Sequence, residues 1–148
     1  MRTFDLERTQ LVEVPIDEAW TFYCDPWNLE QITPPWLRFR IDDAPARLRA
    51  GSRLRYRLHL VGVPIRWLTE IRLWQPPRSF VDVQLQGPYR LWEHTHRLSE
   101  REGGTEIHDH VRYRPPTGVA ADVLVRPLLD QIFDYRACRT AELLSSTS

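Results

Sequence analysis

The sequence predicts an α+β fold in which a curved antiparallel β-sheet grips a long C-terminal α-helix. Residues 52–115 alternate apolar and polar side chains through successive segments, as strands with one buried face do. Residues 118–144 carry apolar side chains at helical spacing, and only this segment is long enough to cover the apolar face of the sheet. The expected order is one strand, two short helices, about six strands and the long helix.

The N-terminal part of the chain predicts one strand and two short helices. Residues 4–14 (FDLERTQLVEV) mix polar and apolar side chains in rough alternation, and the predicted strand ends at Pro15. A short helix is expected next, with Pro15 and Asp17 near its start. Residues 25–36 (DPWNLEQITPPW) predict a second short helix or helical turn, closed by the Pro-Pro pair.

Five of the roughly six further strands can be assigned to segments, each with its own alternation. We expect Tyr56, Trp67, Leu73 and Val83 on the buried face of the sheet, and Asp82 on the opposite, arginine-rich face. The five segments are residues 52–62, 65–77, 79–87, 89–99 and 105–115.

The C-terminal segment predicts one helix over residues 118–144. One apolar stripe of this helix contains Leu124, Leu128, Ile132 and Tyr135. Pro127 lies inside the segment and should either kink the helix or begin its main part. The last residues, SSTS, are expected to form a frayed end.

Composition favours a globular protein, with residues 1–148 as a single ligand-binding domain. All twenty basic residues are arginine and the net charge is zero, so the main driving force for binding nucleic acid is missing. No run of eighteen apolar residues and no signal-peptide pattern occurs, so we expect no membrane insertion and a cytoplasmic location. Cys24 and Cys138 are expected to be buried free thiols.

The last two strands are joined by a Gly-Gly pair at residues 103–104, a typical two-residue hairpin turn. Such a turn would pair Glu102 with Thr105 and place His94 opposite Tyr113. The same register collects the apolar residues of both strands on one face, as a half-buried hairpin requires.

This register separates the four histidines of the hairpin into two pairs. His94 and His96 point inward, whereas His108 and His110 fall on the outer face. Zinc needs three or four ligands that converge within about 2.0–2.3 Å of the ion. We therefore predict no four-histidine metal site and no cofactor.

Buried imidazoles need hydrogen-bond partners, and three roles for His94 and His96 stay open. They could form a structural network, fix the polar head of a ligand, or act as acid and base beside Asp109. No nucleophile with its own base is evident, and no nucleotide-binding or serine-hydrolase motif occurs.

Three stretches, VEVPIDEAWTFYCDPWNLEQITPPWLRFRI, GVPIRWLTEIRLWQPPRSFVDVQLQGPYRLWEHTHRL and GGTEIHDHVRYRPP, resemble the bacterial polyketide cyclase/dehydrase-type branch of the START-like superfamily. The fold of that superfamily is also called helix-grip or birch-pollen-allergen-like. The resemblance implies a deep cavity between the sheet and the long helix, suited to lipids, polyketides or other hydrophobic molecules. Some relatives cyclise or dehydrate polyketides, and many others carry or sense ligands.

We therefore expect a hydrophobic small molecule as the ligand, bound without catalysis, and we leave a homodimer open. The residues expected to line, border or close the cavity are Tyr56, Trp67, Trp92, His94, His96, Asp109, Tyr113, Leu128, Ile132 and Tyr135. One alternative is a cyclase/dehydrase-type enzyme that uses His94 or His96 as its acid or base. Another is a non-catalytic partner module that acts through the arginine-rich outer face of the sheet.

Overall fold

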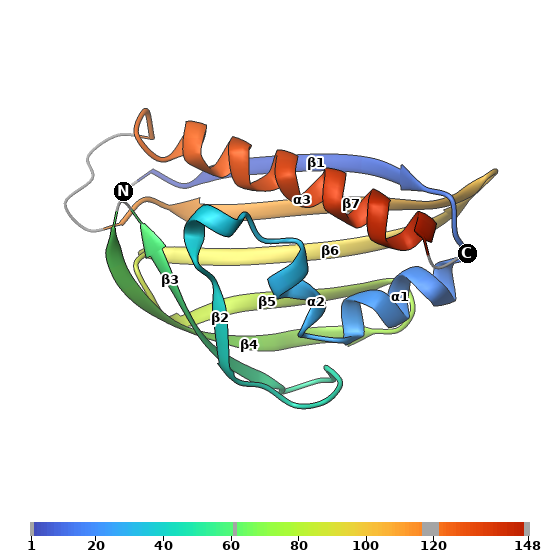
Figure 1. Ribbon diagram of the computed structural model, residues 1–148, viewed down its shortest axis with the longest axis horizontal. Coiled ribbons are helices and arrows are strands. Elements are labelled where there is room, and N and C mark those ends of the chain that lie inside the picture. The colour runs from blue at the N-terminus through green and yellow to red at the C-terminus, as the bar shows by residue number, and fades with distance from the viewer. Residues whose placement is uncertain (1, 61, 117–121, 147–148) are drawn as a thin grey trace.

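A computed structural model describes residues 2–60, 62–116 and 122–146 and has the expected α+β architecture. Seven antiparallel strands form one curved sheet in the order β1-β7-β6-β5-β4-β3-β2, and the long helix α3 lies across it (Figure 1). The strands are β1 (Phe4–Val12), β2 (Arg40–Asp43), β3 (Arg53–Leu60), β4 (Val63–Gln75), β5 (Ser79–Gln86), β6 (Leu91–Arg101) and β7 (Gly104–Arg114).

Two short helices, α1 (Ile16–Cys24) and α2 (Asn28–Gln31), and a 3-10 turn (Pro35–Leu37) connect β1 to β2. Helix α1 begins directly after Pro15, which fits the prediction from sequence. Its buried face packs against the sheet at the end where α3 finishes (Figure 1). The thiol of Cys24 is buried as expected, but that of Cys138 is exposed, so the expectation of two buried thiols is wrong.

Strand β2 was not assigned to any segment in the sequence analysis. It has four residues, RIDD, of which only Ile41 is buried, where it lies opposite Tyr56 of β3. Four residues with a single inward apolar side chain are too short for an alternation to be recognised.

The predicted inward position of Leu73 is wrong. The pairing of β4 with β5 shifts between Arg72 and Gln75, and Leu73 takes a positive φ of 50° there. Such a bulge turns the following side chains over relative to the sheet. Leu73 is therefore 61% exposed, and Trp74 packs against Trp20 instead.

The predicted faces of β5 are also wrong. Phe80 and Asp82 pair with His96 and His94 of β6, which brings these four side chains to the inner face. Asp82 therefore points into the molecule and not toward the outer arginines. The prediction was wrong because β5 has apolar side chains on both faces, so alternation does not show which face is buried. Val83, for example, is buried on the outer side.

The β6–β7 hairpin turns one residue earlier than predicted. Arg101 pairs with Gly104, so Glu102 and Gly103 form the turn and His94 lies opposite Val111. The predicted pairing of Glu102 with Thr105 is wrong by two positions in the register. A slip by two residues leaves every side chain on its face, so the inward direction of His94 is unaffected.

Gly104 is required where it stands because β7 passes close to the end of β1. A Cβ atom on Gly104 would lie 2.0 Å from the carbonyl oxygen of Val12, whereas one on Gly103 would meet nothing within 4 Å. Both glycines have a positive φ, which costs a side chain about 1–2 kcal/mol.

Gly104→Ala is therefore expected to lower the free energy of unfolding by about 2–3 kcal/mol, since overpacking adds to the backbone strain. Gly103→Ala, the matched control, should cost about 1 kcal/mol from strain alone. Urea unfolding of both variants measures the difference. Equal losses would show that the approach to Val12 is not a constraint.

Helix α3 (Arg126–Ser146) begins at the residue before Pro127, which confirms that Pro127 starts the main helix. Residues 118–121 of the predicted helix, and 147–148 of the predicted frayed end, lie outside the described residues. Leu124 is 76% exposed in the turn before the helix, so its predicted place in the apolar stripe is wrong. Leu129, Phe133, Thr140 and Leu144 are the buried residues of α3.

Polar contacts fix α3 over β1. Arg8 of β1 binds both Asp130 and Asp134 of the helix, and the Gln10 amide donates to the carbonyl oxygen of Ala137. Among the described helices, none has the length and hydropathy needed to cross a bilayer.

Candidate functional site

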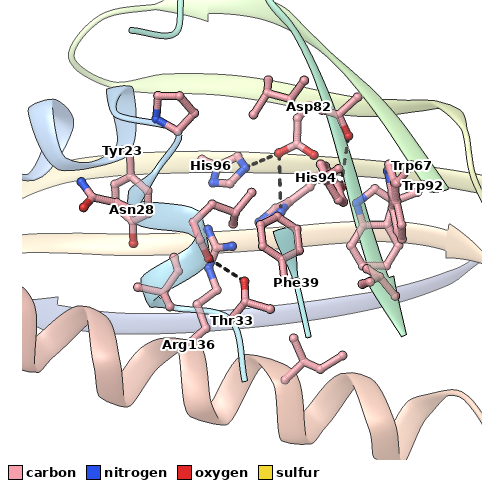
Figure 2. Close-up of a pocket in the computed structure, with 18 of the residues that line it drawn as sticks. Tyr23, Asn28, Thr33, Phe39, Trp67, Asp82, Trp92, His94, His96 and Arg136 are labelled. Carbon is pink, nitrogen blue, oxygen red and sulfur yellow. Dashed lines mark hydrogen bonds and ion pairs between the residues drawn. The ribbon is translucent and has the colours of Figure 1, made fainter. Parts of the chain in front are cut away.

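A cavity of about 170 Å³ lies between the inner face of the sheet and the helices α1, α2 and α3 (Figure 2). Aliphatic side chains from β3 and α3, including Leu58 and Ile132, contribute to its wall. An engineered cavity of about 150 Å³ binds benzene, so this one has room for a ring-sized molecule.

Aromatic side chains form one wall of the cavity. Ring centroids lie 5.6 Å apart for Tyr56 and Trp67, 5.4 Å for Trp67 and Trp92, and 4.8 Å for Tyr89 and Trp92. Phe39, from the segment before β2, packs on Tyr56 at 4.7 Å. These contacts hold the rings in place and present a rigid apolar surface to the cavity.

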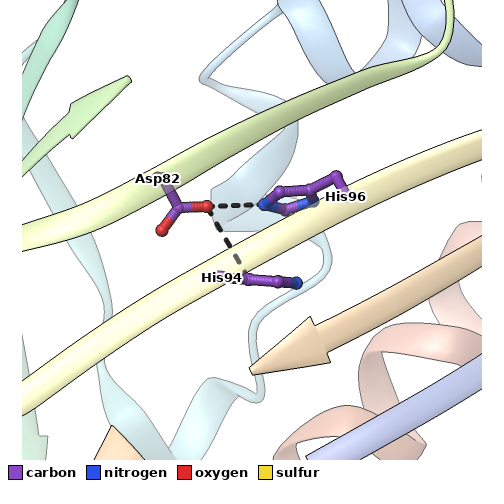
Figure 3. Close-up of side chains that lie close together, drawn as sticks. All are labelled: Asp82, His94 and His96. Carbon is purple, nitrogen blue, oxygen red and sulfur yellow. Dashed lines mark hydrogen bonds and ion pairs between the residues drawn. The ribbon is translucent and has the colours of Figure 1, made fainter. Parts of the chain in front are cut away.

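Acidic and imidazole groups gather beside this wall, on the inner face of the sheet (Figures 2 and 3). His94 and His96 lie two residues apart on β6, so both point to one face, and their rings stack with centroids 3.7 Å apart. Each is almost fully buried, with 3% and 4% of its surface exposed. Nε2 of His96 lies 2.5 Å from Asp82, and Nε2 of His94 lies 2.7 Å from Asp109.

The remaining ring nitrogens turn the two pairs into one network. Nδ1 of His94 lies 3.7 Å from Asp82, and Nδ1 of His96 lies 3.6 Å from Asp109. Arg136 of α3 approaches Asp109 to 3.9 Å and is the guanidinium of this network. Nδ1 of His96 has no hydrogen-bond partner among the described residues.

Burial and the neighbouring His94 lower the pKa of His96 to about 4, so its imidazole is neutral at pH 7. Burial opposes ionisation of Asp109, but the hydrogen bond with His94 and the charge of Arg136 together bring its pKa below the ordinary value. The same holds for Asp82. Burial acts to raise its pKa, but the hydrogen bond with His96 and the nearby His94 outweigh burial and lower the pKa. The network therefore holds two carboxylates beside a neutral His96.

The lowered pKa of His96 predicts that stability falls on acidification. In the unfolded chain, His96 becomes protonated as the pH falls below about 6.5. In the folded protein it becomes protonated only near pH 4, because its pKa is lowered. The free energy of unfolding should therefore drop by up to about 3 kcal/mol between those values. Below that window the two carboxylates, whose pKa values are lowered, lose their contribution too.

Urea unfolding between pH 4.5 and 7 is the measurement, and His96→Gln should flatten the slope in this range. A wild-type protein that is equally stable throughout the range, or that gains stability toward acid, would contradict the assignment of a neutral His96.

In the described part of the chain, Asp82, His94 and His96 form the one group of side chains that could hold a metal ion, because their ligand atoms lie within 4.8 Å of one another. The two imidazole rings are stacked with only 26° between their planes. Their in-plane lone pairs therefore run side by side, while zinc needs them to meet at one point about 2.0–2.1 Å from each nitrogen. A metal would have to rotate the rings and break the bond between His96 and Asp82.

The structure brings most of the residues expected at the site to the cavity, and leaves three away from it. Those that line it are Tyr56, Trp67, Trp92, His94, His96, Leu128 and Ile132. Asp109 lies behind the histidines and does not line the cavity. Tyr113 is fully buried with its hydroxyl donated to Asp122, and the half-buried Tyr135 is not part of the lining.

Sequence reasoning missed Asp82 and Arg136, which both line the cavity. Arg136 follows Ile132 by four residues on α3, so helical spacing from a residue already expected at the cavity could have found it. Asp82 could have been found by extending the pairing of β6 to β5, because Asp82 lies opposite His94.

The outer face of the sheet carries arginines and acids, as expected. His108 and His110 face Glu7 and Asp5 of β1 there. Arg40, Arg57 and Arg66 lie directly opposite one another across β2, β3 and β4, and Arg57 forms an ion pair with Asp42.

Comparison with protein-family models gives one match, described as "Polyketide cyclase / dehydrase and lipid transport", over residues 12–138. No curated protein sequence matches the chain.

Solved structures match over nearly the whole chain. A START superfamily protein from Mycobacterium smegmatis has a TM-score of 0.73 at 12% identity and covers 97% of this chain and 99% of its own. Ara h 8.0201 has a TM-score of 0.71 at 14% identity, with 98% and 99% covered. A nucleoside-diphosphate sugar epimerase from Corynebacterium glutamicum has a TM-score of 0.70 at 22% identity, but 93% of this chain matches only 28% of that one. These similarities confirm the predicted fold.

Proposed function

This chain belongs to the polyketide cyclase/dehydrase and lipid transport family, and we propose that it binds a hydrophobic small molecule in the cavity between the sheet and α3. The observation that carries the proposal is the cavity itself, which is lined by aromatic rings and by a buried polar network beside them. Unfilled space in a protein core costs stability, so a cavity of this size is better explained by a ligand than by packing alone.

The shape and chemistry of the cavity support this function. Ligand sites are mostly apolar, with a few polar groups that fix orientation, and this cavity has that composition. Its volume of about 170 Å³ suits a ring-sized ligand, so a longer lipid or polyketide would need side chains at the rim to move.

Calorimetric titration with benzyl alcohol tests the proposal. We expect saturable binding with a dissociation constant of about 0.1–1 mM, which is usual for so few atoms in a fitting pocket. Native mass spectrometry of the freshly purified protein should in addition show a bound small molecule. A protein that binds neither benzyl alcohol nor ethylbenzene would overturn the proposal.

Enzymatic proton transfer is the second candidate, and the place of a carboxylate-bound histidine, His96, in the cavity lining favours it. Asp82 holds Nε2 of His96, and Nδ1 carries a lone pair but is buried 3.6 Å from Asp109, so it would meet a substrate only if the ring turned toward the cavity. A general base oriented in this way could remove a proton from carbon next to a carbonyl group, the first step of an aldol-type cyclisation. The electron pair of the C–H bond forms the C=C bond of an enolate, the π pair of the carbonyl group moves to its oxygen, and the proton passes to Nδ1.

Deuterium exchange of the methyl protons of acetophenone in D₂O tests this step by NMR. A catalyst would accelerate the exchange over buffer, and His96→Gln would remove the acceleration while His108→Gln, on the outer face, would keep it. Exchange at the buffer rate with wild-type protein, while benzyl alcohol still binds, would leave ligand binding as the function.

A further inference from the structure

We infer that the cavity selects a hydrophobic amine, bound as a cation with its ammonium group beside Asp82 and its apolar body against the aromatic wall. The inference rests on the proposed function and assigns the chemical class of the ligand.

Asp82 supplies the first argument, because it is a carboxylate in the cavity lining whose charged or ionisable partners, among the described residues, are imidazoles alone. Only 17% of its side chain is exposed, and its polar contacts are the ring nitrogens of His96 and His94. Among the residues that the structure describes, no arginine lies within ion-pair distance of Asp82. A buried carboxylate gains most from a partner of opposite charge.

The charge of the whole network points the same way. The charged groups are Asp82 of β5, Asp109 of β7 and Arg136 of α3. Apart from the two imidazoles, the network contains two carboxylates and one guanidinium, whose charges sum to minus one. The low pKa of His96 keeps its imidazole neutral at pH 7, so His96 does not balance this charge. A ligand ammonium would balance it.

The aromatic wall supports a cation as well. Trp67 and Trp92 meet edge to face, and Tyr89 packs on Trp92. The faces of such rings attract ammonium groups by about 0.5–2 kcal/mol. Rings that line the same cavity as a carboxylate are therefore well suited to an amine that carries an apolar group.

A carboxylic acid fits this environment less well. Nε of Arg136 and Nε1 of Trp67 are buried donors without partners, and an acid could use them. The acid would, however, add a third negative charge to a network whose single guanidinium is already beside Asp109. Like charges in a buried site repel strongly. We expect a neutral oxygen-bearing ligand to bind with an affinity between that of the amine and that of the acid.

Calorimetric titration of the wild-type protein with four probes of nearly equal size tests the inference. The probes are benzylamine, benzyl alcohol, ethylbenzene and benzoate, at about pH 8, where ordinary imidazoles are neutral. We expect benzylamine to bind at least about tenfold more tightly than benzyl alcohol, and benzoate to bind most weakly. Benzoate or benzyl alcohol binding as tightly as benzylamine would overturn the inference and leave the proposed function intact. Binding of none of the four would overturn both.

Asp82→Asn keeps the shape of the side chain and removes its charge. The affinity for benzylamine should fall about tenfold while that for benzyl alcohol changes less than about twofold. Asp5→Asn is the matched control, because Asp5 is the partner of His110 on the outer face. Equal losses for both probes would mean that Asp82 only maintains the cavity, and would overturn its role as counter-ion. The wild-type series decides the question if Asp82→Asn does not fold.

Discussion

Replacing Ile132 by tryptophan is expected to abolish measurable binding of benzyl alcohol, a loss of affinity of at least about 30-fold. Ile132 is half-buried on α3, and its side chain lines the cavity opposite the sheet. The larger indole would occupy the space that a ring-sized ligand needs, and a cavity of about 170 Å³ leaves no room for both. Calorimetric titration measures the loss.

Gln131→Trp is the control for this change. It introduces the same side chain one residue away, at an exposed position that does not line the cavity. This variant should bind benzyl alcohol like the wild type. If both variants bind equally well, the ligand does not occupy this cavity.

Asp109→Ala is expected to lower the free energy of unfolding by about 3–5 kcal/mol, because it breaks a buried charged network from one side. The substitution leaves Nε2 of His94 without its acceptor at 2.7 Å and removes the carboxylate nearest to the Arg136 guanidinium. Urea unfolding at pH 7 measures the effect.

Asp5→Ala is the matched control, since Asp5 also contacts a histidine, His110, at 2.7 Å. That pair lies on the exposed outer face, where such contacts contribute about 0–1 kcal/mol. A loss for Asp109→Ala no larger than that for Asp5→Ala would mean that the inner network does not stabilise the fold.

Alternation of side chains was sufficient to predict the faces of β3, β6 and β7. The turn of the last hairpin was misplaced by one residue, yet His94 and His96 were still predicted to point inward. A two-residue slip in register preserves every face, so this prediction was insensitive to the error. For the same reason, His108 and His110 were correctly placed outside.

The outward prediction for Asp82 failed because β5 is apolar on both faces, which removes the contrast that alternation needs. The prediction for Leu73 failed for another reason. A bulge changes the phase of the alternation in β4, and no residue type in the sequence indicates that bulge. Asp82 and the network it forms could be recognised only from the pairing of β5 with β6.

On α3, the predicted apolar stripe lies next to the face that is most deeply buried. Leu128 and Ile132 do line the cavity, while the fully packed residues of that region are Leu129 and Phe133. A helix that both closes a cavity and packs on a sheet has a wide apolar face, and its sequence does not separate the two parts.

Histidine resonances give the most direct test of ligand binding in the cavity. Benzyl alcohol is added to labelled protein, and the imidazole signals of the inner His94 and His96 are compared by NMR with those of the outer His108 and His110. We predict saturable shifts of the inner pair and unchanged signals of the outer pair. Shifts of the outer pair alone, or none at saturating benzyl alcohol, would contradict the proposal that this cavity binds a hydrophobic small molecule.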